Sequence, residues 1–250
     1  MSATLPPARG APKPSLEQLL RREDLWRGHS SIFTHKEGIA TGFAALDRKL
    51  AGKGWPGGTL IELCLAEAYR QQACGGEWIL LAPTIKQLCV NDAYTVLLNP
   101  PAQPFAAGLI QLGLPLNQLL IVQAASKPDF VASFIEFSRS QHCGALLAWQ
   151  PKQALSYTEL RKCQLACAEG KGLYFLSRSH WNTKQNSPAA LRLQLTWQTH
   201  SLQIRIFKQK AYMQVSEIAI DLPGSFMSQP AHNILGSPGQ HTTPLQHDLY

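Results

Sequence analysis

Short apolar runs alternate with longer amphipathic segments between residues 59 and 176 of this 250-residue chain. Runs that are apolar at nearly every position are typical of strands buried on both faces, as in parallel sheets. The alternation predicts an α/β fold with a mainly parallel sheet flanked by helices. Strands are expected at residues 59–65, 94–98, 119–123, 144–149 and 172–176, and helices at residues 75–92, 106–112, 129–141 and 156–169.

Two later segments, residues 190–197 and 202–208, alternate apolar with polar positions instead. Strands with this pattern have one covered face, so the two segments predict a C-terminal antiparallel hairpin at a sheet edge. Ser156 followed by Glu159 matches the capping box, in which each residue's side chain accepts a hydrogen bond from the other's backbone N–H. A helix is therefore expected to begin directly after Ser156.

The two ends of the chain differ in composition from the middle. Residues 1–14 and residues 223–250 each contain four prolines, and the second stretch has no lysine or arginine. We expect a disordered leader and a disordered tail, an N-terminal helical segment at residues 15–37, and one domain at residues 38–222. No run reaches the about 18 apolar residues of a spanning helix, and no secretory signal is recognisable, so a cytoplasmic protein is expected.

The stretch GIATGFAALDRKLAGKGWPGGTLIEL at residues 38–63 opens this domain. Its apolar positions predict a short amphipathic helix, and Pro56-Gly57-Gly58 predicts a turn into the first strand. This stretch resembles the RecA-like core proteins, in which such a pattern precedes the phosphate-binding loop. The matching residues, in order, are Thr41, Gly42, Leu46, Asp47, Leu50, Gly54, Pro56, Gly58 and Glu62.

The phosphate-binding loop that the resemblance implies is missing. That loop ends in Gly-Lys-Ser/Thr, and its backbone N–H groups and lysine bind the β- and γ-phosphates. Residues 64–78 read CLAEAYRQQACGGEW, and no lysine lies between Lys53 and Lys86. Each lost hydrogen bond to a charged phosphate forfeits about 1.5–3 kcal/mol, and Glu67 and Glu77 add repulsion.

The second half of the ATP machinery is missing as well. In phosphate-loop ATPases a strand like residues 144–149 ends in an aspartate that holds Mg²⁺. Here Gln150, Pro151 and Lys152 follow that strand. We therefore expect a RecA-like core with a degenerate phosphate loop, no ATP hydrolysis, no other enzymatic activity and no cofactor.

Several further segments, in sequence order, narrow the resemblance to the bacterial ImuA family, which is also grouped with the SulA-like proteins. The resemblance covers roughly residues 15–223. The matching segments are LWRG, ATGFAALDRKLAGKGWPGG, PPAQPFAAGLIQLGLPLNQLLIV, GALLAW, LRKCQLACAEG and SPAALRLQL.

ImuA proteins are encoded in mutagenesis cassettes induced by DNA damage. They act beside ImuB, a catalytically inactive Y-family polymerase homologue, and beside an error-prone replicative-type polymerase. The resemblance implies a non-catalytic adaptor in translesion synthesis, with RecA as a further partner. One alternative is a SulA-like cell-division inhibitor of the SOS response that binds FtsZ, although such proteins are generally shorter. A second alternative is a degenerate RecA-like ATPase.

The formal net charge is +7, and no acidic residue occurs between Glu169 and Glu217. A one-sign stretch is typical of a surface for a polyanion or an acidic partner, although a solubilising face has the same composition. The resemblance places the loop at residues 177–188, SRSHWNTKQNSP, near DNA, where an aromatic ring can stack on a base of a single strand. The DNA-binding candidates are Arg178, Trp181, Lys184, Arg192, Arg205, Lys208 and Lys210.

Partner-binding candidates lie at both ends of the chain. A short apolar helix near the N-terminus is marginal alone and must pack on its own core or on a partner. The last five residues resemble the pentapeptide by which bacterial polymerases dock on the sliding clamp, where a leucine and an aromatic ring fill an apolar pocket. The candidates are Leu16, Leu19, Leu20, Leu25 and Trp26 in the first group, and Gln246, Leu249 and Tyr250 in the second.

The six cysteines lie mostly inside apolar runs, which predicts reduced, buried thiols. Cys163 and Cys167 share one helical face, but the histidines are scattered and offer no further ligands at a plausible spacing. No metal site is expected.

Overall fold

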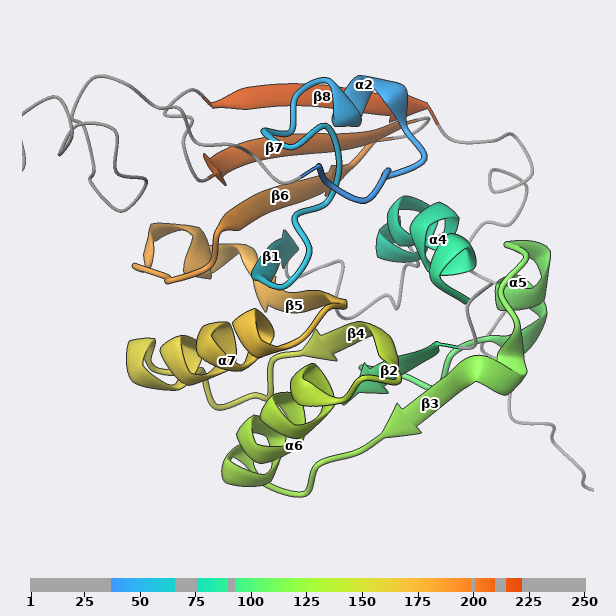
Figure 1. The fold of residues 1–250 in the computed structure, drawn as a ribbon. Helices are drawn as coiled ribbons and strands as arrows, with labels where there is room; N and C mark the ends of the chain where they lie inside the picture. Colours follow the sequence, from blue (N-terminus) through green and yellow to red (C-terminus); the bar gives the residue numbers. More distant parts are fainter. Residues whose placement is uncertain (1–36, 66–75, 90–92, 199–200, 210–214, 222–250) are drawn as a thin grey trace, which may run out of the picture. The chain divides into compact units, whose positions relative to one another are not determined.

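A computed structural model of the chain describes residues 37–65, 76–89, 93–198, 201–209 and 215–221 (Figure 1). The expected leader, N-terminal helical segment and tail therefore lie outside the described residues, together with all eight partner-binding candidates and Lys210. The same holds for residues 66–75, where a phosphate loop would stand. Predictions about these segments stay predictions.

An eight-stranded sheet confirms the expected α/β fold. Its strand order is β3-β2-β4-β5-β1-β6-β7-β8. The strands from β3 to β6 in this list, including β1 and β2, are parallel to one another. Strand β7 is antiparallel to both β6 and β8. The strands are β1 (Leu60–Leu65), β2 (Tyr94–Leu98), β3 (Leu119–Val122), β4 (Cys143–Trp149), β5 (Leu173–Ser179), β6 (Leu191–Trp197), β7 (Ser201–Gln209) and β8 (Ser216–Asp221).

Helices cover both faces of this sheet and bury two separate apolar clusters (Figure 1). Helices α4 and α5 contribute to one cluster, and α6 and α7 contribute to the other. The helices are α2 (Ala44–Asp47), α4 (Gly76–Cys89), α5 (Ala106–Gln111), α6 (Lys127–Arg139) and α7 (Tyr157–Glu169), with single 3-10 turns η1 (Leu116–Gln118) and η2 (His180–Lys184). No helix of the described segments is long and apolar enough to cross a membrane.

The stretch at residues 38–55 packs on α4 through polar contacts. The Trp55 indole N–H donates to Thr84 Oγ1 at 3.0 Å, and Thr84 Oγ1 donates to the backbone oxygen of Ala40 at 3.1 Å. Gly42 has φ +87°, and a Cβ there would lie 2.4 Å from Cβ of Pro83. Only glycine fits both the conformation and this approach, which explains the Thr-Gly pair in the sequence.

The capping box at the start of α7 is confirmed, with both reciprocal hydrogen bonds present between Ser156 and Glu159. Lys127 Nζ lies 2.8 Å from a carboxylate oxygen of Glu159. The hydrogen bond from Lys127 and those from Ser156 lower the pKa of Glu159 to about 2. The local sequence signal and a contact from α6 therefore stabilise the same helix terminus.

Two expectations about the C-terminal strands need correction. The hairpin formed by β6 and β7 does not lie at a sheet edge, because the unpredicted strand β8 pairs with β7. Strand β5 ends at Ser179 rather than at residue 176, so the first residues of the expected loop belong to the sheet. This longer strand carries Arg178 into the interior, with consequences for the candidate site.

Candidate functional site

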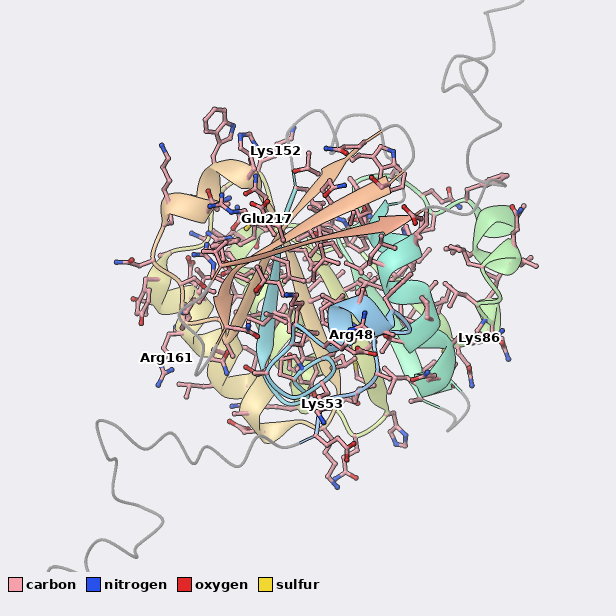
Figure 2. All side chains as sticks on the ribbon, turned by 90° about the horizontal axis from the view of Figure 1, so that it is seen from above. Arg48, Lys53, Lys86, Lys152, Arg161 and Glu217 are labelled. Atoms are coloured by element: carbon pink, nitrogen blue, oxygen red, sulfur yellow. The ribbon has the colours of Figure 1, made fainter. Side chains whose placement is uncertain are left out.

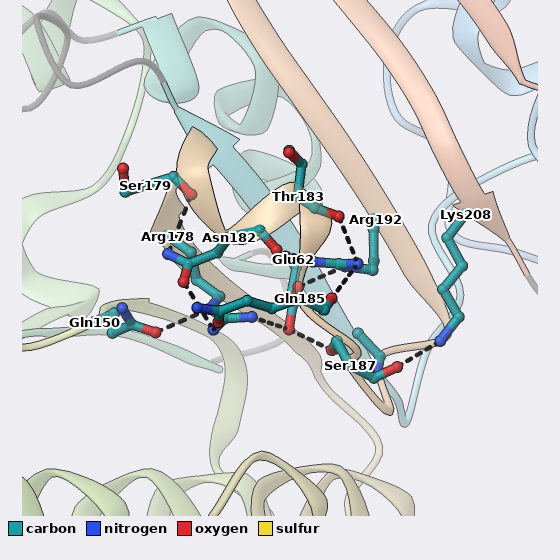
Figure 3. Close-up of polar contacts among 11 residues, drawn as sticks. Glu62, Gln150, Arg178, Ser179, Asn182, Thr183, Gln185, Ser187, Arg192 and Lys208 are labelled. Carbon is teal, nitrogen blue, oxygen red and sulfur yellow. Dashed lines mark hydrogen bonds and ion pairs between the residues drawn. The ribbon is translucent and has the colours of Figure 1, made fainter. Parts of the chain in front are cut away.

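A buried carboxylate, Glu62, lies at the centre of a polar cluster on β1. Because β1 pairs with β5 on one side and β6 on the other, an arginine from each neighbour reaches it (Figure 3). Arg178 Nη1 lies 3.1 Å from Oε1 of Glu62, and Arg192 Nε lies 2.7 Å from Oε2. Ser187 Oγ also donates to Oε1. The three charged groups are nearly inaccessible to solvent.

The remaining donors of the two arginines tie down the segment that follows β5. Arg178 donates to the side-chain oxygens of Gln150, Asn182 and Gln185 at 2.8, 3.3 and 3.1 Å. Arg192 donates to the backbone oxygens of Asn182 and Gln185 at 2.8 and 3.1 Å. Charge-assisted hydrogen bonds of this kind satisfy the buried cations. The cluster therefore fixes η2 against β5 and β6.

The basic stretch of the sequence is therefore not one exposed surface. Arg178 and Arg192 are 0% and 5% exposed, so our expectation that they contact DNA is not supported by their placement. Arg205 is exposed but lies 3.5 Å from Glu217 on β8, which offsets its charge. Besides Arg205, the accessible candidates among the described residues are Trp181, Lys184 and Lys208.

Lys184 on η2 and Lys208 on β7 line a groove of about 710 Å³, and Trp181 belongs to the same 3-10 turn as Lys184. Lys208 Nζ donates to the backbone oxygen of Ser187 at 2.6 Å. Partial burial, and secondarily Arg192, lower the pKa of Lys208. The groove is lined by Tyr157, Thr183, Lys184, Gln185, Asn186, Ser187, Arg192, Phe207 and Lys208.

Aromatic and cationic groups occur both in this groove and on η2, part of which lines it. The Arg192 guanidinium lies 4.8 Å from the ring centroid of Phe207. On η2 the Trp181 ring is 70% exposed and lies 4.2 Å from the His180 ring. Such a surface can hold a phosphodiester on its cations and stack a base on its exposed indole.

A second cluster lies where β4 ends and α4 begins. The Trp149 and Trp78 rings are 6.3 Å apart, and Glu77 beside them is only 6% exposed. The Trp149 indole nitrogen and Oε2 of Glu77 have no hydrogen-bond partner among the described residues. Desolvation raises the pKa of Glu77 to about 7, and a hydrogen bond from its own backbone N–H opposes part of this rise. An acid in an apolar, aromatic setting does not suit a triphosphate.

The five described cysteines are free and buried. Burial raises the pKa of Cys64, Cys143 and Cys163 to about 12. Thiols of this kind carry almost no nucleophilic thiolate at neutral pH. Among the described residues, no group of three or more histidine, cysteine, aspartate or glutamate side chains is placed to hold a metal ion.

Sequence reasoning missed the ion cluster, although two signals pointed to it. Glu62 is the lone charge in an apolar run, and Arg192 stands in the alternating run LRLQL. A charge at a buried strand position must be paired, so each implied an opposite charge on a neighbouring strand. Comparison with models of known protein families and with curated proteins gives no match for this chain.

Proposed function

We propose that this chain is a non-catalytic adaptor in DNA-damage-induced translesion synthesis, built on a RecA-like core and acting with ImuB-like and error-prone polymerase partners. The observation that carries the non-catalytic part lies at the carboxyl end of β4. In α/β sheets, ligands bind beyond the carboxyl ends of parallel strands. At that end of β4, Trp149 packs on Trp78 beside the buried Glu77.

The strand arrangement supports a RecA-like origin for the core. β1 is an interior strand of the sheet, and the next described element along the chain is α4. The strand that would supply the Mg²⁺ ligand, β4, ends beside the first turn of α4, as the Trp149–Trp78 contact requires. The end of β4, which lacks the Mg²⁺ ligand, and the start of α4, which follows the missing phosphate loop in sequence, therefore lie side by side. The polymerase partners rest on the sequence resemblance.

Affinity capture of the tagged full-length chain from cells with damaged DNA tests the adaptor role. We expect an ImuB-like protein and an error-prone polymerase in the recovered material, with RecA. A parallel capture without residues 246–250 reports whether the tail recruits the sliding clamp. Recovery of FtsZ without polymerase components, together with filamentation on overexpression, would instead establish the division-inhibitor alternative. Magnesium-dependent ATP turnover by the purified chain would exclude a non-catalytic adaptor.

A second candidate function is binding of single-stranded DNA, which the groove beside η2 favours. Lys184 and Lys208 supply accessible positive charge there, and Trp181 supplies an exposed ring. The buried arginines act indirectly, because they fix η2, which carries Trp181 and Lys184. Only three of the seven sequence candidates are therefore proposed as direct contacts.

Substituting Trp181 with alanine is expected to weaken oligonucleotide binding roughly 5- to 150-fold, since base stacking contributes about 1–3 kcal/mol. Lys184→Ala should lower the slope of log affinity against log salt by about 0.7. Fluorescence anisotropy over a salt series measures both effects. The control is Lys86→Ala, an exposed lysine on α4 (Figure 2). Equal affinity in all four proteins would exclude the groove as a DNA site.

A further inference from the structure

The stretch of chain that forms one end of the sheet contains no charged residue. From residue 93 to residue 126 there is no aspartate, glutamate, lysine or arginine. This stretch includes β2, α5, η1 and β3, and β3 is the terminal strand of the sheet among the described residues. A terminal strand presents backbone N–H and C=O groups that can pair with another strand.

Apolar side chains are exposed on both faces of β3. Leu120 and Ile121 are adjacent, so they point to opposite faces of the sheet, and they are 42% and 52% exposed. Phe105 and Ile110, which precede β3 in the chain at α5, are also exposed. Apolar exposure of this extent beside an open strand is typical of an interface.

The opposite edge of the same sheet is protected. Strand β8 alternates, with Ile218 and Ile220 buried and Glu217 and Asp221 exposed. Figure 2 labels Glu217 on this strand. Charges on an edge strand discourage pairing with another chain. Within the part of the chain that the structure describes, β8 is therefore protected by charge and β3 has no strand on its outer side.

We infer that β3 pairs with β3 of a second copy of this chain, antiparallel and around a two-fold axis beside Ile121. In that register Ile121 faces Ile121 of the partner subunit, and Leu120 faces Val122 of the partner subunit. Residues directly opposite each other then point to the same face, as an antiparallel pair requires. The two sheets become one continuous sheet, and each exposed side chain of β3 gains an apolar neighbour.

Charge favours a second copy over a polyanion. Residues 93–126 offer no positive charge to a polyanion, whereas two copies of this stretch carry no charges that repel each other, although the chain has a net charge of +7. A two-fold arrangement also closes, so it yields a dimer rather than a filament. This inference does not depend on the proposed role in translesion synthesis.

Sedimentation velocity of the full-length chain over a concentration series tests the dimer. We expect a species of twice the monomer mass, and Ile121→Lys should weaken its association at least 10-fold. The matched control is Ala219→Lys, which places the same charge at an exposed position of β8, and it should leave the dimer unchanged. A chain that is monomeric throughout, or two variants that behave alike, would overturn the inference.

A cross-linking variant tests the register separately. Two Ile121→Cys side chains across the axis would have Cα atoms about 4.5–5.5 Å apart, which suits a disulfide. Mild oxidation should therefore cross-link Ile121→Cys at concentrations where the dimer forms. Leu120→Cys faces Val122 of the partner subunit and should cross-link more slowly, with the unchanged chain as the background. Equal cross-linking of the two variants would reject the axis at Ile121.

Discussion

Replacing Glu62 with glutamine is expected to lower the free energy of unfolding by about 3–5 kcal/mol. The substitution keeps the shape of the side chain but removes the only carboxylate that contacts Arg178 and Arg192 in the described structure. Two buried guanidinium groups are then left without an opposite charge. Urea denaturation at neutral pH, followed by circular dichroism, measures the loss.

Glu169→Gln is the matched control for this prediction. Glu169 pairs with Arg139 through two hydrogen bonds of 2.7 and 3.1 Å, but both side chains are more than half exposed. Exposed pairs contribute at most about 1 kcal/mol. If Glu62→Gln and Glu169→Gln lower the free energy of unfolding equally, the buried cluster does not stabilise the fold as its burial indicates.

Hydrogen exchange on the Glu62→Gln variant distinguishes a structural role of the cluster from a role in DNA binding. If Arg178 contacted DNA, its loss would weaken oligonucleotide binding and leave folding unchanged. The structure predicts the reverse order of effects, because Arg178 is fully buried and anchors Asn182 and Gln185. Removing Glu62 should therefore speed backbone hydrogen exchange in η2 before it affects any surface contact.

Local signals predicted most elements of the fold. The apolar run at residues 94–98 is β2 with the same bounds, and the capping box places the start of α7. Strand β8 was missed because its sequence, SEIAID, is short and carries two acidic residues. Its partner, β7, supplies the backbone pairing that local composition does not reveal.

Long-range pairing explains the remaining differences. The run LLIV of β3 is as apolar as that of an interior strand, and only the strand order makes it an edge. Likewise Arg178 is separated in sequence from its partner Glu62 by 116 positions. A stretch that lacks acidic residues is therefore not a basic surface when a distant strand supplies the opposite charge. Charge patterning along a sequence predicts a surface only where the residues are exposed.

Glu77→Gln is expected to make the chain about 3 kcal/mol more stable than the parent at pH 8, but less than about 1 kcal/mol more stable at pH 5. Desolvation raises the pKa of Glu77 in the folded chain to about 7 from an ordinary value of 4.5. At a pH between these two pKa values, the folded state holds a proton that the unfolded state has lost. Parent stability therefore falls as pH rises through this range, by about 1.36 kcal/mol per unit of pKa difference.

Glutamine does not ionise, so the stability of the Glu77→Gln variant does not fall over this pH range. The comparison is best made as the difference between variant and parent at each pH, since that cancels other titrating groups. Glu159, whose pKa is lowered to about 2, acts only below about pH 4.5 and does not overlap. Glu217→Gln, at an exposed position, is the control and should show no such difference. A Glu77→Gln difference that is independent of pH would mean that the carboxyl group is hydrated, and that the site beside the two indole rings admits water.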